Sequence, residues 1–231
     1  MIRLDKYLAL SGRGTRSEVK ELVRKGQISV NGTPVKTADL KIAETDTVTV
    51  NGETVRYEEY EYWILYKPAG FLTARTDREK HVVMELVPSF RKELAPVGRL
   101  DEDTEGVLLL TDDGALAHEL LSQKKHVKKT YYAELDAALP LDAEERLSKP
   151  IVFKDFTSEP VDAFEKITDK SAYLTISEGK FHEVKRLFHA IGCDVTYLKR
   201  TAFGPLTLDG MKAGDARRLT DEEIRKLKER E

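Results

Sequence analysis

The most constraining feature of this sequence is a carboxylate-rich turn, residues 98–106 (GRLDEDTEG), that lies between two apolar segments. Leu94–Val97 leads into the turn and Val107–Leu110 leads out of it, a pattern typical of buried strands. Asp101 is therefore held at the end of sheet structure, close to apolar residues. Because a lone buried carboxylate is costly, the turn is expected to face water, to bind a cation, or to use Asp101 chemically.

The cation interpretation fits the sequence poorly. Asp101, Asp103 and Glu105, followed by Gly106, imitate the start of a calcium-binding EF-hand loop. The ninth position would then be a leucine and the twelfth an aspartate, so two of the usual ligands are missing. The solvated-turn interpretation suits Glu102 and Glu105 better than Asp101.

Cysteine and histidine usage predicts no metal site. The single cysteine, Cys193, excludes a multi-cysteine zinc site and an internal disulfide framework, and it is expected to be a packed small residue. His81, His118 and His126 do not have a metal-ligand spacing. We therefore expect no structural or catalytic metal.

The N-terminal region differs from the rest of the chain in charge. Residues 1–36 contain eight lysines and arginines against three acidic residues, a net charge of +5 in a chain whose overall net charge is −3. The spacing of Leu4, Tyr7 and Leu8 predicts one helix, and the capping-box pair Thr15 and Glu18 predicts the start of a second. Asn-Gly pairs at 31–32 and 51–52 predict tight hairpin turns. A small unit of two helices and short hairpins is expected.

Three basic residues form a ridge on the second predicted helix. Arg16, Lys20 and Arg24 lie at i, i+4 and i+8, beside the apolar stripe of that helix. From the spacing alone, the ridge is either a solvated face or a phosphate-binding surface.

The residues around this ridge have a known counterpart. The segments RLDKYL (3–8), TRSE (15–18) and KGQISVNG (25–32) resemble the S4 RNA-binding domain over roughly the first quarter of the chain. The resemblance implies that the ridge contacts phosphates of structured RNA. The basic residues expected to contact RNA here are Arg3, Lys6, Arg13, Arg16, Lys20, Arg24 and Lys25.

The remainder of the chain is expected to be one α+β domain. Tyr62–Tyr66 has the pattern of a strand that ends at a Lys-Pro-Ala-Gly turn, and neither a long linker nor a low-complexity segment follows. We therefore predict a small RNA-binding domain at 1–58 and a larger domain at 59–231.

The carboxylate-rich turn is part of a longer motif. The segment GRLDEDTEGVLLLTDDG (98–114) resembles the signature of pseudouridine synthases of the RsuA branch. Further matching blocks are YKPAG (66–70), KTY (129–131), EGKFHEVKRL (178–187) and GPLTL (204–208). Glu183 and Leu187 stand where the branch often has glutamine and methionine. The resemblance implies a mixed, mostly antiparallel β-sheet with flanking helices, and a nucleophilic role for Asp101.

The expected reaction converts uridine into pseudouridine. It breaks the N1–C1′ bond and rejoins the base to the sugar through C5, with no net gain of electrons, so neither a redox nor a dinucleotide cofactor is expected. A carboxylate can attack C1′, as in retaining glycosidases, or add to C6 of the base, and both routes remain open.

Two partners for Asp101 are implied by the resemblance. Arg186 would pair with the carboxylate and keep it ionised. From helical periodicity alone, an ordinary surface arginine is the better interpretation of Arg186, and the surrounding motif reverses this preference. Tyr131 would handle the proton that leaves C5, although the alternating strand Lys129–Leu135 also allows a core tyrosine on the inward face.

A second basic segment lies next to Tyr131. It contains Lys124, Lys125, Lys128 and Lys129, of which we expect Lys128 and Lys129 to contact RNA. Arg99 is expected to hold the backbone around an extruded uridine. Some of these lysines fit a simple solvated charge run as well.

The predicted function is isomerisation of one uridine in ribosomal RNA, with the small-subunit 16S RNA favoured. The alternatives are a large-subunit 23S RNA, a non-catalytic ribosome-assembly factor, and a metal-dependent hydrolase that uses Asp101 and Asp103. The expected partner is ribosomal RNA or a pre-ribosomal particle. The sequence has no signal-peptide or membrane-spanning pattern, and a cytoplasmic location is expected. We also expect a monomer.

Overall fold

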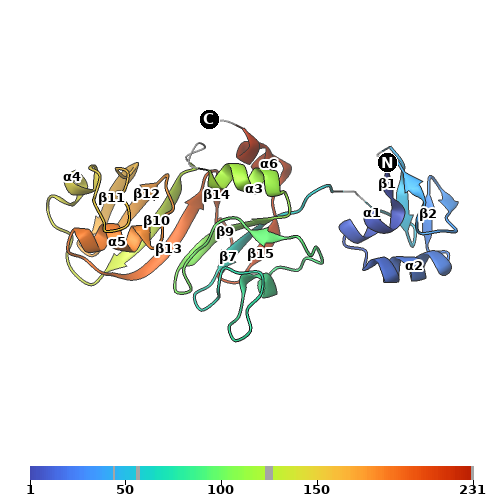
Figure 1. The fold of residues 1–231 in the computed structure, drawn as a ribbon, viewed down its shortest axis with the longest axis horizontal. Coiled ribbons are helices and arrows are strands. Elements are labelled where there is room, and N and C mark those ends of the chain that lie inside the picture. The colour runs from blue at the N-terminus through green and yellow to red at the C-terminus, as the bar shows by residue number, and fades with distance from the viewer. Residues whose placement is uncertain (44, 56–57, 123–126, 230–231) are drawn as a thin grey trace. The chain divides into compact units, whose positions relative to one another are not determined.

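A computed structural model of the chain describes residues 1–43, 45–55, 58–122 and 127–229. These residues form two compact units (Figure 1): Met1–Glu61 with Pro88–Leu94, and Tyr62–Val87 with Ala95–Glu231. Within the described ranges, no helix combines the length and apolar character needed to cross a membrane.

The first unit packs two helices on short strands. The helices are α1 (Leu4–Leu10) and α2 (Arg16–Arg24). The strands are β1 (Ile2–Arg3), β2 (Ile28–Val30), β3 (Thr33–Pro34), β4 (Lys41–Ile42), β5 (Val48–Val50) and β6 (Glu53–Val55). One sheet has the order β3-β2-β5-β6, and β1 pairs with β4. Apolar residues of both helices, including Leu8 and Val19, are buried with the strand residues Ile28 and Val48.

Local sequence signals determine this unit. The Thr15 hydroxyl accepts a hydrogen bond from the Glu18 N–H, and the Glu18 carboxylate accepts one from the Thr15 N–H at 2.6 Å, so the predicted capping box is confirmed. Asn31 and Asn51 have φ values of 50° and 52°, and each precedes a glycine that also has positive φ. Both predicted Asn-Gly turns are therefore present.

The boundary between the two units lies after Glu61, whereas the sequence predicts it after residue 58. The first unit continues to Glu61 and includes Pro88–Leu94 because Arg91 joins these segments. The Arg91 Nε lies 3.4 Å from Glu61 Oε1 and donates to the Leu10 carbonyl at 2.8 Å. The same guanidinium donates to the Glu58 and Glu59 carbonyls. Sequence periodicity cannot reveal such a return contact.

The second unit is built on a long mixed sheet. Its strand order is β11-β12-β10-β13-β9-β7-β15, and neighbours are antiparallel except for the parallel pair β9 and β13. The strands are β7 (Tyr62–Lys67), β8 (Ala95–Pro96), β9 (Glu105–Thr111), β10 (Lys129–Leu135), β11 (Ala163–Thr168), β12 (Ser171–Ile176), β13 (Val195–Phe203), β14 (Leu206–Thr207) and β15 (Ala216–Arg218). The helices are η1 (Val83–Leu86), α3 (Gly114–Leu121), α4 (Ala143–Leu147), α5 (Glu183–Ala190) and α6 (Asp221–Lys228). The predicted α+β fold with a mostly antiparallel sheet is confirmed.

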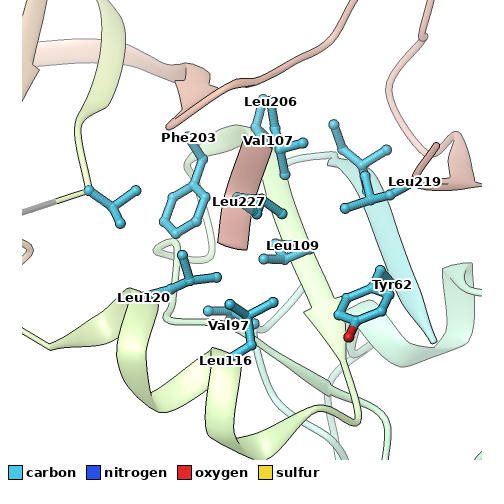
Figure 2. Packing of buried hydrophobic residues seen from close by; sticks show 12 residues of the cluster. Tyr62, Val97, Val107, Leu109, Leu116, Leu120, Phe203, Leu206, Leu219 and Leu227 are labelled. Atoms are coloured by element: carbon cyan, nitrogen blue, oxygen red, sulfur yellow. The ribbon is translucent and has the colours of Figure 1, made fainter. Parts of the chain in front are cut away.

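Helices α3 and α6 bury apolar side chains against one half of this sheet (Figure 2). Leu116 and Leu120 of α3 and Leu227 of α6 pack with Leu109 of β9 and Phe203 of β13. On the other half, α5 buries the apolar stripe that the sequence predicts, Val184, Leu187 and Phe188, with Ile191 just after the helix. Cys193 is buried, as expected.

The parallel junction of β9 and β13 requires glycine at position 106. Gly106 has a φ of 115° and lies opposite Arg200, and an added Cβ would lie 2.1 Å from the Arg200 carbonyl oxygen. Gly106→Ala is therefore expected to lower the free energy of unfolding by about 3 kcal/mol, or about 6–12 °C in Tm. Thermal denaturation followed by circular dichroism measures this effect.

Gly114→Ala is the matched control for this substitution. An added Cβ at Gly114, at the start of α3, meets no atom within 4 Å, so its Tm should equal or slightly exceed that of the wild type. Equal melting temperatures for the two variants would contradict the close approach at Gly106.

Candidate active site

A cavity of about 240 Å³ lies in the second unit, beside the carboxylate-rich turn. Its walls come from the segment after β8, from β10 and β13, and from the start of α5. Asp101, Tyr131, Lys185 and Arg200 are among its lining residues. The fold therefore brings together residues that are up to 99 positions apart in the chain.

The turn that carries Asp101 is fixed by a buried lysine. Lys67, at the end of β7, is fully buried, and its ammonium donates to the carbonyls of Pro68, Glu102 and Thr104 at 3.0, 3.1 and 2.8 Å. Burial lowers the pKa of Lys67 to about 8, although nearby carboxylates, Asp103 first among them, oppose the shift. In the sequence Lys67 is recognisable only as part of a turn, and no pattern indicates this role.

Asp101 is partly exposed and faces two basic side chains. Its Oδ2 lies 3.2 Å from Lys185 Nζ, and its Oδ1 lies 3.4 Å from His182 Nε2. Lys185 also binds Asp103 at 2.7 Å. Burial disfavours the charge on Lys185, but Asp103 and Asp101 outweigh it and raise the Lys185 pKa. The ammonium therefore stays positive beside Asp101.

Tyr131 occupies the predicted inward face of β10. Lys129, Tyr131, Ala133 and Leu135 are all buried, so the alternation expected from the sequence is confirmed. Tyr131 also lines the cavity that contains Asp101. The carboxylate and the phenol thus share one site.

The predicted ion pair between Asp101 and Arg186 is not present. Arg186 instead donates to both carboxylate oxygens of Asp155, and its guanidinium lies 4.5 Å from the ring centres of Phe153 and Phe156. Consecutive helical residues point about 100° apart, so on α5 only Lys185 reaches Asp101. The motif contains both basic residues, and the one that lies beside Asp101 is Lys185.

The residues at the start of α5 adopt an unusual backbone. His182, which precedes the helix, has a φ of 51°, a value that is uncommon for a residue with a side chain. Its ring stacks on the exposed Phe181 with centres 3.8 Å apart. This conformation places the imidazole beside Asp101, and helical periodicity did not indicate it.

Comparisons with known proteins agree with this site. Residues 61–190 match the family model described as RNA pseudouridylate synthase, and residues 2–48 match the S4 domain. The chain belongs to the RNA pseudouridine synthase family. It is therefore an isomerase that acts on RNA, with an N-terminal S4 domain.

Relatives of this pseudouridine synthase cover almost the whole chain. The ribosomal large subunit pseudouridine synthase B of Bacillus subtilis is 37% identical over 99% of this chain and 96% of its own length. The ribosomal small subunit pseudouridine synthase A of Vibrio parahaemolyticus is 35% identical over 96% of this chain and 98% of its own. A crystal structure of a pseudouridylate synthase aligns with a TM-score of 0.69 and 33% identity, over 98% of this chain and all of that one.

The basic residues expected to contact RNA in the S4 domain are mostly solvent-exposed. Arg16, Lys20 and Arg24 are exposed on α2. Lys6, Arg13 and Lys25 are also exposed, and so is Arg3, which binds the Asp5 carboxylate through two hydrogen bonds. Arg3, Lys20 and Arg24 line an open hollow together with Lys36. These four basic residues therefore share one hollow of this domain, which Asp39 also lines.

The basic residues expected around the synthase site separate into two groups. Arg99 and Lys128 are exposed, and Arg99 lines the cavity. Lys129 is buried inside the cavity wall, where its ammonium donates to the carbonyls of Val127 and Ser177 at 2.7 and 2.9 Å. Lys124, Lys125 and His126 lie outside the described residues.

No metal-binding cluster occurs within the residues for which the structure gives positions. In particular, no group of three or more histidine, cysteine, aspartate or glutamate side chains is arranged to hold an ion there. Asp101 and Asp103 instead share the ammonium of Lys185.

Glu183 gives the enzyme a pH-dependent stability. Burial, together with the nearby Glu178 carboxylate, raises the pKa of Glu183 to about 7. Between about pH 4.5 and pH 7 the folded protein holds a proton that the unfolded chain releases, so stability falls as pH rises through this window.

Glu183→Gln removes this titration and keeps an oxygen for the Lys180 N–H, which donates to Glu183 at 2.9 Å. At pH 8 the variant should exceed the wild type in Tm by about 2–4 °C or more, and the difference should shrink toward pH 5. Glu145→Gln, at an exposed ion pair with Lys149, is the control and should change Tm little at either pH. A pH-independent difference for Glu183→Gln would contradict the raised pKa.

Proposed function

We propose that this enzyme converts a uridine of ribosomal RNA into pseudouridine with Asp101 as the nucleophile. The observation that carries the proposal is the position of the Asp101 carboxylate. It lies in the cavity that Tyr131 also lines, 3.2 Å from the Lys185 ammonium. A carboxylate held by a cation at the edge of a cavity is suited to attack a base or sugar that enters it.

The proposed sequence of events begins with extrusion of the uridine, which costs a few kcal/mol of lost stacking. Arg99, exposed at the rim of the cavity, then holds the vacated RNA backbone. Asp101 attacks C1′ or C6, the N1–C1′ bond breaks, and the base turns within the cavity. C5 then bonds to C1′ and the bond to the Asp101 carboxylate breaks. The C5 proton leaves, Tyr131 receives or relays it, and N1 takes up a proton. Lys185, whose pKa Asp103 and Asp101 raise, keeps a positive charge beside the Asp101 carboxylate.

The proposed substrate is ribosomal RNA, free or in a pre-ribosomal particle. The sequence analysis favours the 16S RNA, and the relatives include one named for each ribosomal subunit at similar identity. Asp101, Tyr131 and Lys185 all belong to one chain, so we propose that the enzyme acts as a monomer. The two relatives named above come from bacteria, in which ribosomes assemble in the cytoplasm, so we propose the same location for this enzyme.

A tritium-release assay tests this function. Small- and large-subunit RNA carrying tritium at uridine C5 would be incubated separately with the wild-type enzyme, and modified positions would then be mapped. Release from one RNA, at one position, is expected. If neither RNA releases tritium, alone or in a pre-ribosomal particle, ribosomal RNA is not the substrate.

The basic ridge on α2 is expected to bind RNA phosphates. If Arg16, Lys20 and Arg24 each neutralise one phosphate, changing all three to alanine should make RNA binding less dependent on salt. The slope of the logarithm of the binding constant against the logarithm of the salt concentration should become shallower by about 2. Binding is measured by fluorescence anisotropy over a range of salt concentrations.

A second basic helix provides the control for the ridge. Arg225, Lys226 and Lys228 on α6 are changed to alanine, which removes the same charge from another helix. There Arg225 pairs with Glu229, Lys226 with Glu222, and Lys228 with Asp113. This variant should retain the wild-type slope. Equal slopes for the ridge variant and the wild type would remove the ridge from the RNA interface.

A further inference from the structure

Arg200 is a buried cation in the wall of the cavity that holds Asp101. It lies on β13, opposite Tyr131 of β10 on one side and Gly106 of β9 on the other. Only 2% of the residue is exposed, yet it lines the cavity. Its Nε donates to the Val107 carbonyl at 2.7 Å, and its guanidinium lies 5.2 Å from the centre of the Phe203 ring. These contacts fix the guanidinium in place.

The outer nitrogen of this guanidinium has no protein partner. Over the ranges that the structure describes, Arg200 Nη2 is the buried side-chain nitrogen that forms no hydrogen bond. Nor does Arg200 form an ion pair with any carboxylate in those ranges. An unsatisfied buried donor costs about 1–3 kcal/mol, and more when it is charged. A fixed donor of this kind at a cavity wall points to an acceptor on a ligand.

A second buried cation lies near Arg200. Lys129 already donates to two carbonyl groups, and burial followed by the positive charge of Arg200 lowers its pKa to about 8. The neighbouring wall residues Leu198 and Phe203 are apolar and buried. A wall that combines positive charge with apolar surface suits a flat ring whose oxygens carry negative charge.

The position of Arg200 favours a base oxygen over a phosphate oxygen. In folded RNA the phosphates remain on the backbone, outside the cavity, and only the extruded base enters it. Arg200 lines the cavity and only 2% of the residue is exposed, so a group that binds its free nitrogen has to enter through the cavity. The acceptor is therefore a carbonyl of the uracil ring.

The reaction itself generates negative charge on those carbonyls. When Asp101 attacks C1′, the N1–C1′ bond breaks, and its electron pair stays on the base, shared among N1, O2 and O4. When Asp101 instead adds to C6, an oxygen–carbon bond forms and the C5–C6 π pair moves toward C5 and O4. Either route therefore places charge on a ring carbonyl, where a preorganised donor is most effective.

We propose that Arg200 is a further catalytic residue, whose Nη2 donates to a carbonyl oxygen of the extruded uracil and stabilises the charge that develops there. This inference rests on the proposed site at Asp101. Arg200 would thus contact the substrate directly, a role that no pattern in the sequence indicates.

Single-turnover kinetics test the proposal. The substrate is the ribosomal RNA from which the wild type releases tritium. Arg200→Met should lower the rate constant by about 10²–10³-fold and leave the Kd for RNA within about threefold, because phosphate contacts dominate RNA affinity.

Lys199→Met, one position earlier on β13 and outside the cavity lining, is the control and should retain both values. An unchanged rate for Arg200→Met overturns the proposal while the proposed function stands. No release by the wild type overturns both.

Chemical rescue separates a catalytic role from a structural one. Guanidinium chloride, far below denaturing concentrations, should raise the activity of the Arg200→Ala variant by at least about tenfold. Urea should not raise it. Equal effects of the two additives would assign Arg200 a structural role and overturn the proposal.

A measurement on the unaltered enzyme covers the case in which these variants do not fold. The guanidinium NMR signals of ¹⁵N-arginine-labelled wild type are followed on addition of the substrate RNA and of the same RNA with an abasic site at the target. The Arg200 signals should shift with the first RNA only. A shift with both RNAs, or with neither, overturns the contact with the base.

Discussion

Asp101→Asn is expected to lower the single-turnover rate of tritium release by about 10⁴-fold or more, the scale seen when a nucleophile is removed. The amide has nearly the shape of the carboxylate but cannot act as a nucleophile. The Kd for RNA should change little, since RNA binding depends mainly on phosphate contacts. Tritium release measures the rate, and fluorescence anisotropy measures the Kd.

Asp103→Asn is the matched control for this prediction. Asp103 lies two residues away in the same turn and binds the same Lys185 ammonium at 2.7 Å, but its side chain is 72% exposed and it is not among the cavity-lining residues. Its replacement should cost less than about tenfold in rate, as expected for an exposed ion pair. Similar losses for the two variants would mean that the charge of the turn, rather than the Asp101 nucleophile, supports the reaction.

The sequence predicts most of the first unit because its structure is encoded locally. The Thr15–Glu18 capping box and the Asn-Gly pairs at 31 and 51 each act over four residues or fewer, and all three appear in the structure. In the second unit, the inward face of β10 and the apolar stripe of α5 follow from simple periodicity. The mixed sheet itself was inferred only through the family resemblance.

The parts of the site that sequence reasoning misses depend on contacts between distant segments. Lys67 holds the turn through backbone carbonyls of Glu102 and Thr104, which have no side-chain signature. The burial of Arg200 depends on the pairing of β13 with both β9 and β10. The orientation of Lys185 depends on where α5 begins, and the positive φ of His182 sets that point.

Lys185→Met is expected to lower the rate of tritium release by about 100-fold, equivalent to about 2.7 kcal/mol. Lys185 Nζ lies 3.2 Å from Asp101, and its raised pKa keeps it charged. Without the ammonium, the Asp101 carboxylate loses the cation that holds it at the cavity, and the rate should fall for this reason. Lys185→Arg retains the charge and should recover most of the activity.

Arg186→Met is the control that decides which basic residue of α5 supports Asp101. Because Arg186 binds Asp155 on an exposed surface, its loss should change the rate by less than about threefold and leave the pH profile unaltered. The difference between the two adjacent substitutions follows directly from the direction in which α5 presents their side chains. If Arg186→Met were inactive and Lys185→Met active, the reacting enzyme would use the arginine that the sequence suggested, and the pairing of Lys185 with Asp101 would have no catalytic role.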